Sequence, residues 1–312
     1  MKRREFLKHA TALGGALSAS NLDAAQEPQA LAIVDTHLHL WDLNRFRLPW
    51  IRKDSPLARS FVMKDYLTAT AGLHVVSAVY MEVDVEVGQQ RAEAEYVFDI
   101  CRQNNTPMKA AVISGRPAAD DFRAYLEGFK RSPYLKGVRQ VLHGDSTPAG
   151  FCLAPNFVRG IRLLGEMGLS FDLCMRSGEL ADGIKLIEAC PNTRFILDHC
   201  GNMNVQSNDR MQWQRDLERM ARSSNVVCKV SGIVASARPK KWTAADLAPI
   251  VNHTLNTFGP ERVLFGGDWP VCTTTATYRQ WVEALKSIVR ERPMGEQRKL
   301  FHDNAMRFYG IK

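Results

Sequence analysis

Cysteine is scarce in this sequence, and its spacing excludes two common roles. Seven cysteines in 312 residues are too few for a disulfide-stapled scaffold. None of them forms a C-x-x-C pair, so a redox motif or a paired zinc knuckle is not indicated either. Because seven is an odd number, at least one thiol cannot pair within the chain. We therefore expect free, buried thiols.

Long apolar runs and runs of one charge are also missing. Beyond residue 30, no stretch reaches the roughly 20 apolar residues of a transmembrane helix, so we expect no stable membrane insertion. The 41 basic and 33 acidic residues give a net charge of +8, but no lysine or arginine run suggests nucleic-acid binding. A small-molecule partner, with a mild preference for an anionic one, fits this composition. The oligomeric state stays open.

Residues 1–30 are typical of a twin-arginine export signal. Arg3 and Arg4 form the basic pair, and a weakly apolar, Ala/Gly-rich stretch follows over 10–20. That stretch is too short to span a bilayer. A frayed basic N-terminus is the alternative. The signal predicts export, to the periplasm, with the cleavage point undetermined.

From residue 31 onward, short apolar runs alternate with longer amphipathic stretches. The runs are LAIVDT, HVVSAVYME, MKAAVISG, LKGVRQVL, LSFDLCM, RFILDH, NVVCKVSG and RVLFGGD. Each is rich in branched apolar side chains, as in strands buried on both faces. Repeated strand–helix units predict an α/β fold, a single-domain (β/α)₈ TIM barrel over 31–312. An open doubly wound sheet is the alternative, but no glycine-rich phosphate loop follows the first run.

The connection 41–61 and the end of the chain have their own patterns. Residues 41–61 form a long connection that contains two prolines, which predicts a loop over one end of the barrel. Residues 294–312 predict a final helix packed on the barrel.

Polar residues follow nearly every predicted strand, where the functional groups of a barrel gather. His37 and His39 are two positions apart on an extended strand, so their side chains point the same way. Two imidazoles in this arrangement suit the chelation of a divalent metal. Hydrogen-bonded structural histidines are the alternative.

Two later motifs supply further candidates. Asp268 follows a buried strand and two glycines, and it either takes a proton from a hydrolytic water or caps the next helix. His199 could polarise a carbonyl, move a proton or bind metal. Because neighbours on a strand alternate, we expect Asp198 to point the other way and to be structural.

Buried cations in the strands need anionic partners. Arg139 lies within the apolar LKGVRQVL, so either a substrate carboxylate or Glu82 should satisfy it, and Lys229 has the same two alternatives. Arg176, at the end of the fifth strand, is a second candidate for holding substrate hydroxyls or a carboxylate. Trp41 either packs in the protein or stacks on a sugar ring.

Five motifs together carry a family resemblance. DTHLHLWD, LKGVRQ, LDHCGN, CKVSG and LFGGDWPV, with FHDNAMRFYG near the end, resemble the amidohydrolase superfamily. The most similar branch is that of the amidohydrolase-related lactonases, which includes fuconolactonases, rhamnonolactonases and pyrone-dicarboxylate lactonase. The matches run in order from about residue 33 to 310.

The resemblance implies a distorted (β/α)₈ barrel that hydrolyses a cyclic ester, of the sugar-acid or pyrone-carboxylate type. His37 and His39 match the paired histidines, His199 matches the later active-site histidine, and Asp268 matches the acid that activates water. Arg139 and Glu82 match strand-end residues near the substrate.

Two departures limit the expected metal content. A carboxylated lysine bridges the two metals of binuclear relatives, but this chain has Arg139 and Gln140 at the fourth strand. No histidine ends the fifth strand. We therefore expect at most one divalent metal, zinc or manganese, on His37, His39 and Asp268, and none is the alternative.

Two other functions compete with a lactonase. Related barrels with one metal decarboxylate aromatic or unsaturated acids, so a metal-dependent decarboxylase is the second hypothesis. An exported binding protein without activity is the third, and the retained Asp268 and first-strand histidines disfavour it. We expect substrate specificity to reside in loops 41–61, 144–155 and 202–209.

Overall fold

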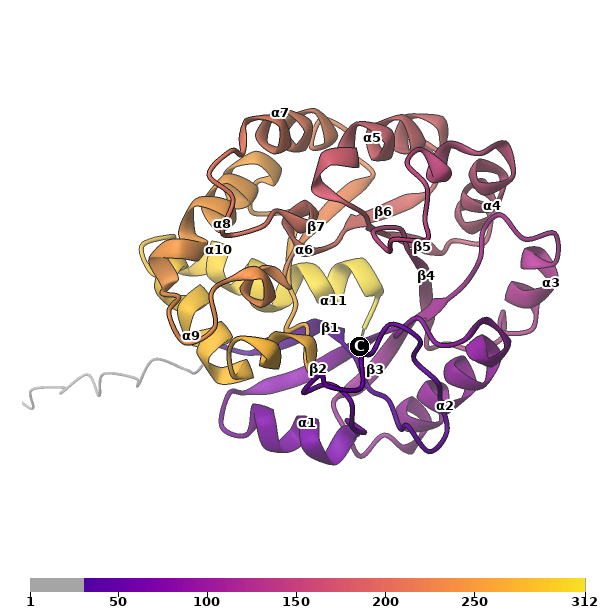
Figure 1. Cartoon of the computed structure of the whole chain (residues 1–312), viewed down its shortest axis with the longest axis horizontal. Helices are drawn as coiled ribbons and strands as arrows, with labels where there is room; N and C mark the ends of the chain where they lie inside the picture. Colours follow the sequence, from indigo (N-terminus) through magenta and orange to yellow (C-terminus); the bar gives the residue numbers. More distant parts are fainter. Residues whose placement is uncertain (1–30, 312) are drawn as a thin grey trace, which may run out of the picture. The chain divides into compact units, whose positions relative to one another are not determined.

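Eight parallel strands form the centre of the molecule, paired in the order in which they occur in the chain. The computed structural model describes residues 31–311 (Figure 1). The strands are β1 (Ile33–Leu38), β2 (Val75–Met81), β3 (Met108–Ser114), β4 (Leu135–Val141), β5 (Ser170–Cys174), β6 (Arg194–Leu197), β7 (Val226–Val230) and β8 (Val263–Phe265). Seven of them lie within the predicted apolar runs, and β1 continues two residues beyond its run, to Leu38. Most of their residues are buried, as strands covered on both faces require.

The sheet closes where β8 returns to β1. The Asp268 N–H donates to the carbonyl of His37 over 2.8 Å, and the His39 N–H donates to the carbonyl of Trp269, also over 2.8 Å. A parallel bridge joins Leu38 to Trp269. The predicted TIM barrel is therefore confirmed, and its closure brings the first and the last motif side by side.

Helices surround the strands in a ring (Figure 1). They are α1 (Met63–Thr70), α2 (Gln90–Gln103), α3 (Phe122–Glu127), α4 (Pro155–Glu166), α5 (Leu180–Ala189), α7 (Met211–Met220), α8 (Ala244–Phe258) and α9 (Tyr278–Val289). Local sequence sets some of their ends. Thr243 and Asp246 form a capping box at the start of α8, and Thr277 and Gln280 form one at the start of α9.

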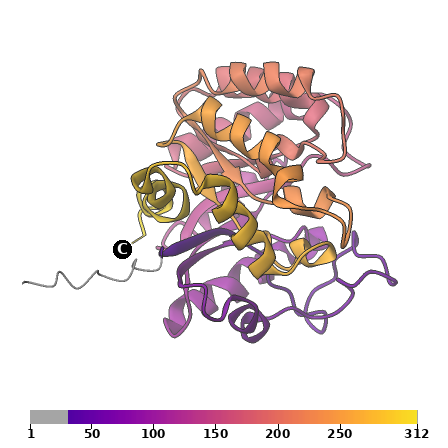
Figure 2. The ribbon, with the colours of Figure 1, turned by 90° about the vertical axis from the view of Figure 1, so that its left-hand side faces the viewer.

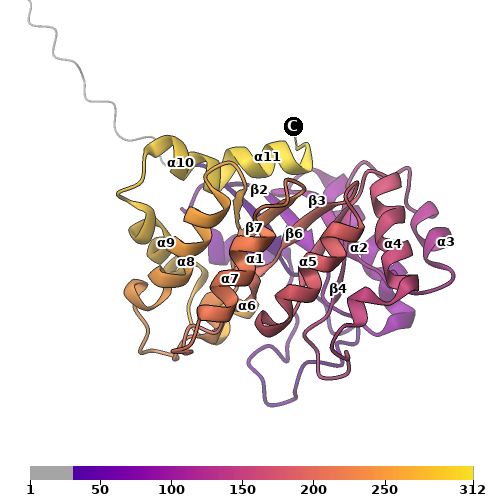
Figure 3. The same ribbon diagram turned by 90° about the horizontal axis from the view of Figure 1, so that it is seen from above.

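The C-terminal helices close one end of the barrel. They are α10 (Met294–Arg298) and α11 (Asn304–Tyr309), joined by a π-helical turn over Lys299–Asp303. Ala305 and Tyr309 of α11 pack with Val34, Val79 and Leu264 inside the barrel. Loop 41–61 lies at the opposite end (Figures 2 and 3). The predicted terminal helix is confirmed apart from its π turn.

Other expectations from the sequence fare as follows. All seven cysteines fall in the described part of the chain, where they are buried and free of disulfides, as expected. Among residues 31–311, no helix has the length and apolarity needed to cross a membrane. The predicted export signal lies outside the described residues.

Candidate active site

A cavity of about 460 Å³ opens at the loop end of the barrel. Four predicted site residues line it: His39, Arg139, His199 and Asp268. They come from or directly follow β1, β4, β6 and β8, so the carboxyl ends of the strands converge here, as in other TIM barrels. His37 lies beside them and is fully buried.

Asp268 is held between the two histidines of β1. Its Oδ1 lies 3.3 Å from His39 Nε2 and 3.8 Å from His37 Nε2. The side chain is only slightly exposed, and its backbone has a left-handed φ of 52°. The following 3₁₀-helix Val271–Thr274 has Pro270 as its N-cap, so Asp268 is not a helix cap. The carboxylate is therefore available for chemistry.

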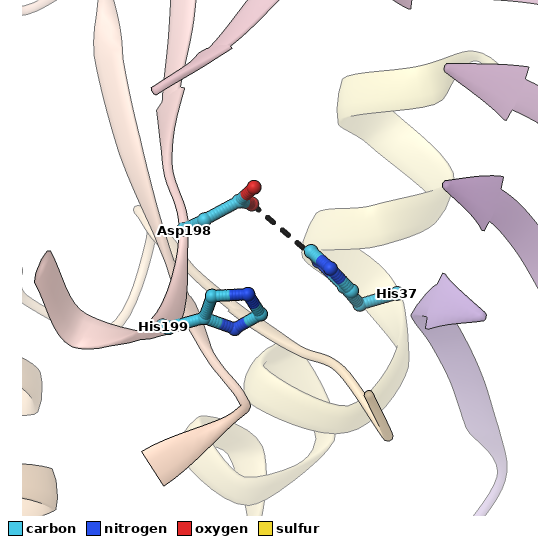
Figure 4. A group of neighbouring side chains, drawn as sticks. All are labelled: His37, Asp198 and His199. Carbon is cyan, nitrogen blue, oxygen red and sulfur yellow. Dashed lines mark ion pairs between the residues drawn. The ribbon is translucent and has the colours of Figure 1, made fainter. Parts of the chain in front are cut away.

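The environment of His37 keeps its imidazole neutral. Nδ1 lies 3.5 Å from both Asp198 Oδ1 and Lys229 Nζ, and Nε2 lies 3.3 Å from Arg139 Nη1 (Figure 4 shows the contact with Asp198). Burial is the main cause that lowers the pKa of His37 well below its ordinary value, and Asp198 only partly opposes this.

Asp198 does not point away from the site, so that prediction is wrong. It is fully buried and lies beside His37 (Figure 4). Arg139 and Lys229 also contact its carboxylate, at 3.5 and 3.3 Å. The alternation fails because Asp198 is extended whereas His199 has a left-handed φ of 54°, which turns both side chains inward. Burial would raise the pKa of Asp198, but Lys229 and His37 hold it well below its usual range.

Arg139 finds its anionic partner within the protein. Its Nε donates to Glu82 Oε1 over 2.6 Å, and its Nη2 donates to the carbonyl of Glu82 over 2.6 Å. Of the two partners expected from the sequence, the structure therefore supplies Glu82. Burial opposes the charge of Arg139, but Glu82 and other neighbours raise the pKa of the guanidinium above its ordinary value.

Lys229 joins the strands beneath the cavity. It is fully buried, donates to Asp172 Oδ2 over 2.5 Å, and lies 3.3 Å from Asp198 Oδ1. Burial raises the pKa of Asp172 to about 7, although Lys229 opposes this. Sequence reasoning missed Asp172, although a lone acid within the apolar LSFDLCM was a signal for a buried ion pair.

Arg176 and Trp41 do not line the cavity. Arg176 donates to the carbonyls of Gly144 and Thr147 over 2.6 and 2.9 Å and so holds the loop after β4. Trp41 is fully buried, and its Nε1 donates to the carbonyl of Arg59. Both side chains thus hold loops in place through hydrogen bonds to backbone carbonyls. The tryptophan on the cavity wall is Trp50, which the sequence analysis did not single out.

A neighbouring glycine gives His199 its room. His199 Nδ1 lies 2.9 Å from Ser231 Oγ, which fixes one edge of the ring. Gly232 has a left-handed φ of 66°, and a Cβ there would lie 2.2 Å from His199 Nδ1. The CKVSG motif therefore both orients and accommodates this imidazole. Burial lowers the pKa of His199, so its ring is neutral near pH 7.

Comparisons with known proteins identify the family. The model of the amidohydrolase family matches residues 34–311. The chain belongs to the amidohydrolase family. An L-fucono-1,5-lactonase of Burkholderia multivorans is 26% identical over 290 residues, which cover 89% of this chain and 96% of that one. An L-rhamnono-gamma-lactonase of Scheffersomyces stipitis is 25% identical over an alignment of 336 residues, gaps included. The alignment covers 89% of this chain and 98% of that one.

A solved amidohydrolase structure extends the likeness to the fold. This protein, from Burkholderia multivorans and with bound zinc, has a TM-score of 0.81 and 24% identity. The match covers 90% of this chain and 100% of that chain. The barrel and the order of its strands are thus those of an amidohydrolase.

In this amidohydrolase, one group of side chains has the donor set for a divalent metal. His37, His39 and Asp268 each offer one ligand atom, and these atoms lie within 4.8 Å of one another. His39 Nδ1 lies 2.9 Å from the carbonyl of Met81, and donating there leaves a lone pair on Nε2 that faces Asp268. A lone pair facing a carboxylate at 3.3 Å needs a proton or a cation between them.

The separation between His39 and Asp268 also fits zinc. Tetrahedral zinc with bonds of about 2.0–2.1 Å places its ligand atoms roughly 3.3 Å apart, and the His39–Asp268 separation is 3.3 Å. A second group, His37, Asp198 and His199, is similarly close, but Lys229 already supplies a cation next to its Asp198. The residues present therefore fit one divalent ion, with His39 and Asp268 as its firmest ligands because Arg139 also contacts His37 Nε2.

Asp35 supports the site without entering the cavity. Its carboxylate accepts hydrogen bonds from the N–H groups of His37 and Gly267 and from the hydroxyls of Tyr66 and Tyr278. These donors tie β1 to α1, to α9 and to the segment before Asp268. A Cβ at Gly267 would lie 2.2 Å from the Tyr278 ring and 2.6 Å from Asp35 Oδ2, so this contact requires glycine.

We expect Gly267→Ala to destabilise the protein by about 1–3 kcal/mol, because the added methyl overpacks this junction. Gly295→Ala is the matched control, since a Cβ there has no neighbour within 4 Å and Gly295 lies in α10. That control should be neutral or slightly stabilising. Urea denaturation of both variants measures the difference, and equal midpoints would show that the junction is not tightly packed.

Proposed function

We propose that this amidohydrolase hydrolyses a lactone, with Asp268 as the base that activates water. The observation that carries the proposal is the position of Asp268 in the cavity lining, together with His39 and His199. Asp268 Oδ1 lies 3.3 Å from His39 Nε2. The names of the two lactonase relatives support the choice of a cyclic ester.

The first step attacks the carbonyl of the ring. Asp268 accepts a proton from a water molecule, and the water oxygen bonds to the lactone carbonyl carbon. The carbonyl oxygen becomes an oxyanion and needs a donor. With Ser231 donating to His199 Nδ1, the neutral His199 keeps a proton on Nε2 and donates it to the oxyanion as a hydrogen bond.

The second step opens the ring. The tetrahedral intermediate re-forms its carbonyl and breaks the bond to the ring oxygen. Asp268 returns its proton to the leaving alkoxide, so one water is consumed for each hydroxy acid formed. The acid then releases a proton to the solution at neutral pH.

A divalent metal would be held by His37, His39 and Asp268. When bound, it would supply Lewis-acid polarisation and lower the pKa of a bound water. The other residues act independently of it: Lys229 and Asp198 fix His37 from below, and Glu82 holds Arg139 at the cavity wall.

The test is a hydrolysis screen of the purified protein with a pH indicator. Lactones of the sugar-acid, pyrone-carboxylate and alkyl types form the panel, and carbon dioxide is measured in parallel. We expect acid release from at least one lactone. Release of carbon dioxide from an aromatic acid, with no lactone hydrolysed, would instead favour the metal-dependent decarboxylase.

We expect the purified protein to bind about one equivalent of zinc, and Asp268→Asn or His39→Ala to weaken that binding at least tenfold. The first replaces a carboxylate by a neutral amide oxygen, which is a weaker ligand, and the second removes an imidazole from the group that fits a metal. Equilibrium dialysis against buffered zinc measures it. His302→Ala is the matched control because His302 lies in the π turn near the closed end of the barrel. Equal zinc affinities in all four proteins would place the metal elsewhere.

A further inference from the structure

The cavity lining has a polar part and an apolar part. His39, His199 and Asp268 gather where the ring carbonyl must lie, whereas Trp50, Val83, Val141, Ala235 and Val271 form much of the remaining wall. An apolar wall of this kind stabilises a bound molecule through van der Waals contacts and the exclusion of water, and it forms few hydrogen bonds.

The polar side chains on that wall are mostly engaged with the protein itself. Ser236 Oγ accepts from the N–H of Val205 over 3.0 Å and donates to the carbonyl of Ile233 over 2.9 Å. The Asn202 amide donates to the carbonyl of Met175 over 2.9 Å. These groups are therefore poorly placed to pair with several hydroxyls of a sugar lactone.

The polar group of Trp50 is also bonded within the protein. Its Nε1 donates to the carbonyl of Val83 over 2.7 Å, so the polar edge of the indole is held by the protein. The side chain is 42% exposed and lines the cavity from loop 41–61. This position suits a flat apolar contact with a substituent that extends from the ring toward the mouth.

The charges of the lining also argue against a dianion. Arg139 is bound to Glu82, and Asp84 is bound to Arg116 over 2.9 Å. Burial, with the neighbouring His199 and Arg139, lowers the pKa of His143 to about 4, so its imidazole is neutral near pH 7. Within residues 31–311, the cavity lining thus contains no cation without an anionic partner. Apart from a metal held by His37, His39 and Asp268, nothing in this lining would replace the hydration of the second carboxylate of a dicarboxylate.

We propose that the substrate is an uncharged lactone with an apolar alkyl or aryl substituent, and neither a polyhydroxylated sugar-acid lactone nor a pyrone dicarboxylate. This inference rests on the proposed lactone hydrolysis and narrows its substrate class. The lactone carbonyl lies near Asp268 and His199, and the substituent packs against Trp50, Val83 and Val271. Each methylene buried there should raise kcat/KM by up to about fourfold.

The experiment compares cyclic esters whose rings all have six members. Kcat/KM is measured for δ-valerolactone, δ-nonalactone, L-fucono-1,5-lactone and 2-pyrone-4,6-dicarboxylate with the purified protein. We expect δ-nonalactone to exceed δ-valerolactone at least about tenfold, and the two polar compounds to fall below δ-valerolactone. Faster hydrolysis of either polar compound would overturn the inference while leaving lactone hydrolysis intact.

Binding separates this inference from the proposed chemistry. Calorimetry on the Asp268→Asn variant measures affinity for the same four compounds without turnover. Tighter binding of δ-nonalactone supports the apolar substrate class even if no compound is hydrolysed, in which case only the proposed reaction fails. Tighter binding of the sugar lactone or the dicarboxylate overturns the substrate class.

A substitution of Trp50 tests whether this side chain causes the preference for δ-nonalactone over δ-valerolactone. We expect Trp50→Ser to lower kcat/KM for δ-nonalactone about tenfold more than for δ-valerolactone, mainly through KM, because the contact is with the substituent. Trp50→Phe is the conservative control and should keep most of the preference. Equal losses on both substrates in Trp50→Ser would contradict the proposed contact.

Discussion

Asp268→Asn should lower kcat for lactone hydrolysis by at least about a thousandfold, within the range that a positioned general base contributes. The amide has nearly the shape of the carboxylate but cannot take a proton from water near pH 7. Asp268 is only 3% exposed and has no capping role, so its charge is free to act on substrate and water. Stopped-flow or indicator assays on a hydrolysed lactone measure the loss.

Two further measurements make the result specific. Asp54→Asn is the matched control, because Asp54 is an exposed acid of loop 41–61 that pairs with Arg52. It should turn over like the unaltered protein. Circular dichroism and thermal unfolding should show that Asp268→Asn keeps its fold. A kcat within about fivefold of the unaltered protein would remove Asp268 as the base.

Lys229→Met should destabilise the protein by about 3–5 kcal/mol, because it leaves the buried Asp172 without its cation and the buried Asp198 with only Arg139, 3.5 Å away. Lys229 is fully buried between Asp172 and Asp198, at 2.5 and 3.3 Å. Methionine has a similar shape, so the loss reflects charge more than volume. Urea denaturation at pH 7 measures the change in unfolding free energy.

Controls separate this buried network from ordinary ion pairs. Lys185→Met removes a surface pair with Asp182, in which the lysine side chain is 62% exposed, and should cost about 1 kcal/mol or less. Adding Asp172→Leu to Lys229→Met should recover part of the lost stability. If Lys229→Met cost no more than Lys185→Met, the buried network would not stabilise the barrel.

The same network has an expected pH dependence. Because Lys229 and His37 depress the pKa of Asp198, that carboxylate stabilises the folded state above its unfolded pKa of about 3.9. This contribution is lost as pH falls from there through the folded pKa. The stability difference between Lys229→Met and the unaltered protein should therefore narrow below about pH 3.9.

The barrel was predictable from the sequence because its strands are buried on both faces. Such strands appear as short runs of branched apolar residues, and each of the eight runs marks one of the eight strands, although β1 continues two residues beyond its run. The pairing of His37 with His39 followed from the two-residue period of a strand. Their meeting with Asp268 followed from closure of the barrel, which needs only the order of the strands.

One prediction failed where the backbone leaves regular geometry, and two alternatives stayed open where the outcome depends on three-dimensional contacts. Asp198 was misplaced because the left-handed His199 breaks the alternation. The choice between Glu82 and substrate for Arg139 depended on three-dimensional distances. Trp41 and Trp50 lie in one long loop, and composition cannot show which of them is buried and which lines the cavity.

Hydrolysis of a lactone in ¹⁸O-labelled water, under single-turnover conditions, tests the central claim most directly. If water activated by Asp268 attacks the ring carbonyl, mass spectrometry will find one ¹⁸O in the carboxylate of the hydroxy acid. The product should form at least about a thousandfold more slowly with Asp268→Asn. Label in the hydroxyl group, or product formed equally fast by that variant, would contradict the account.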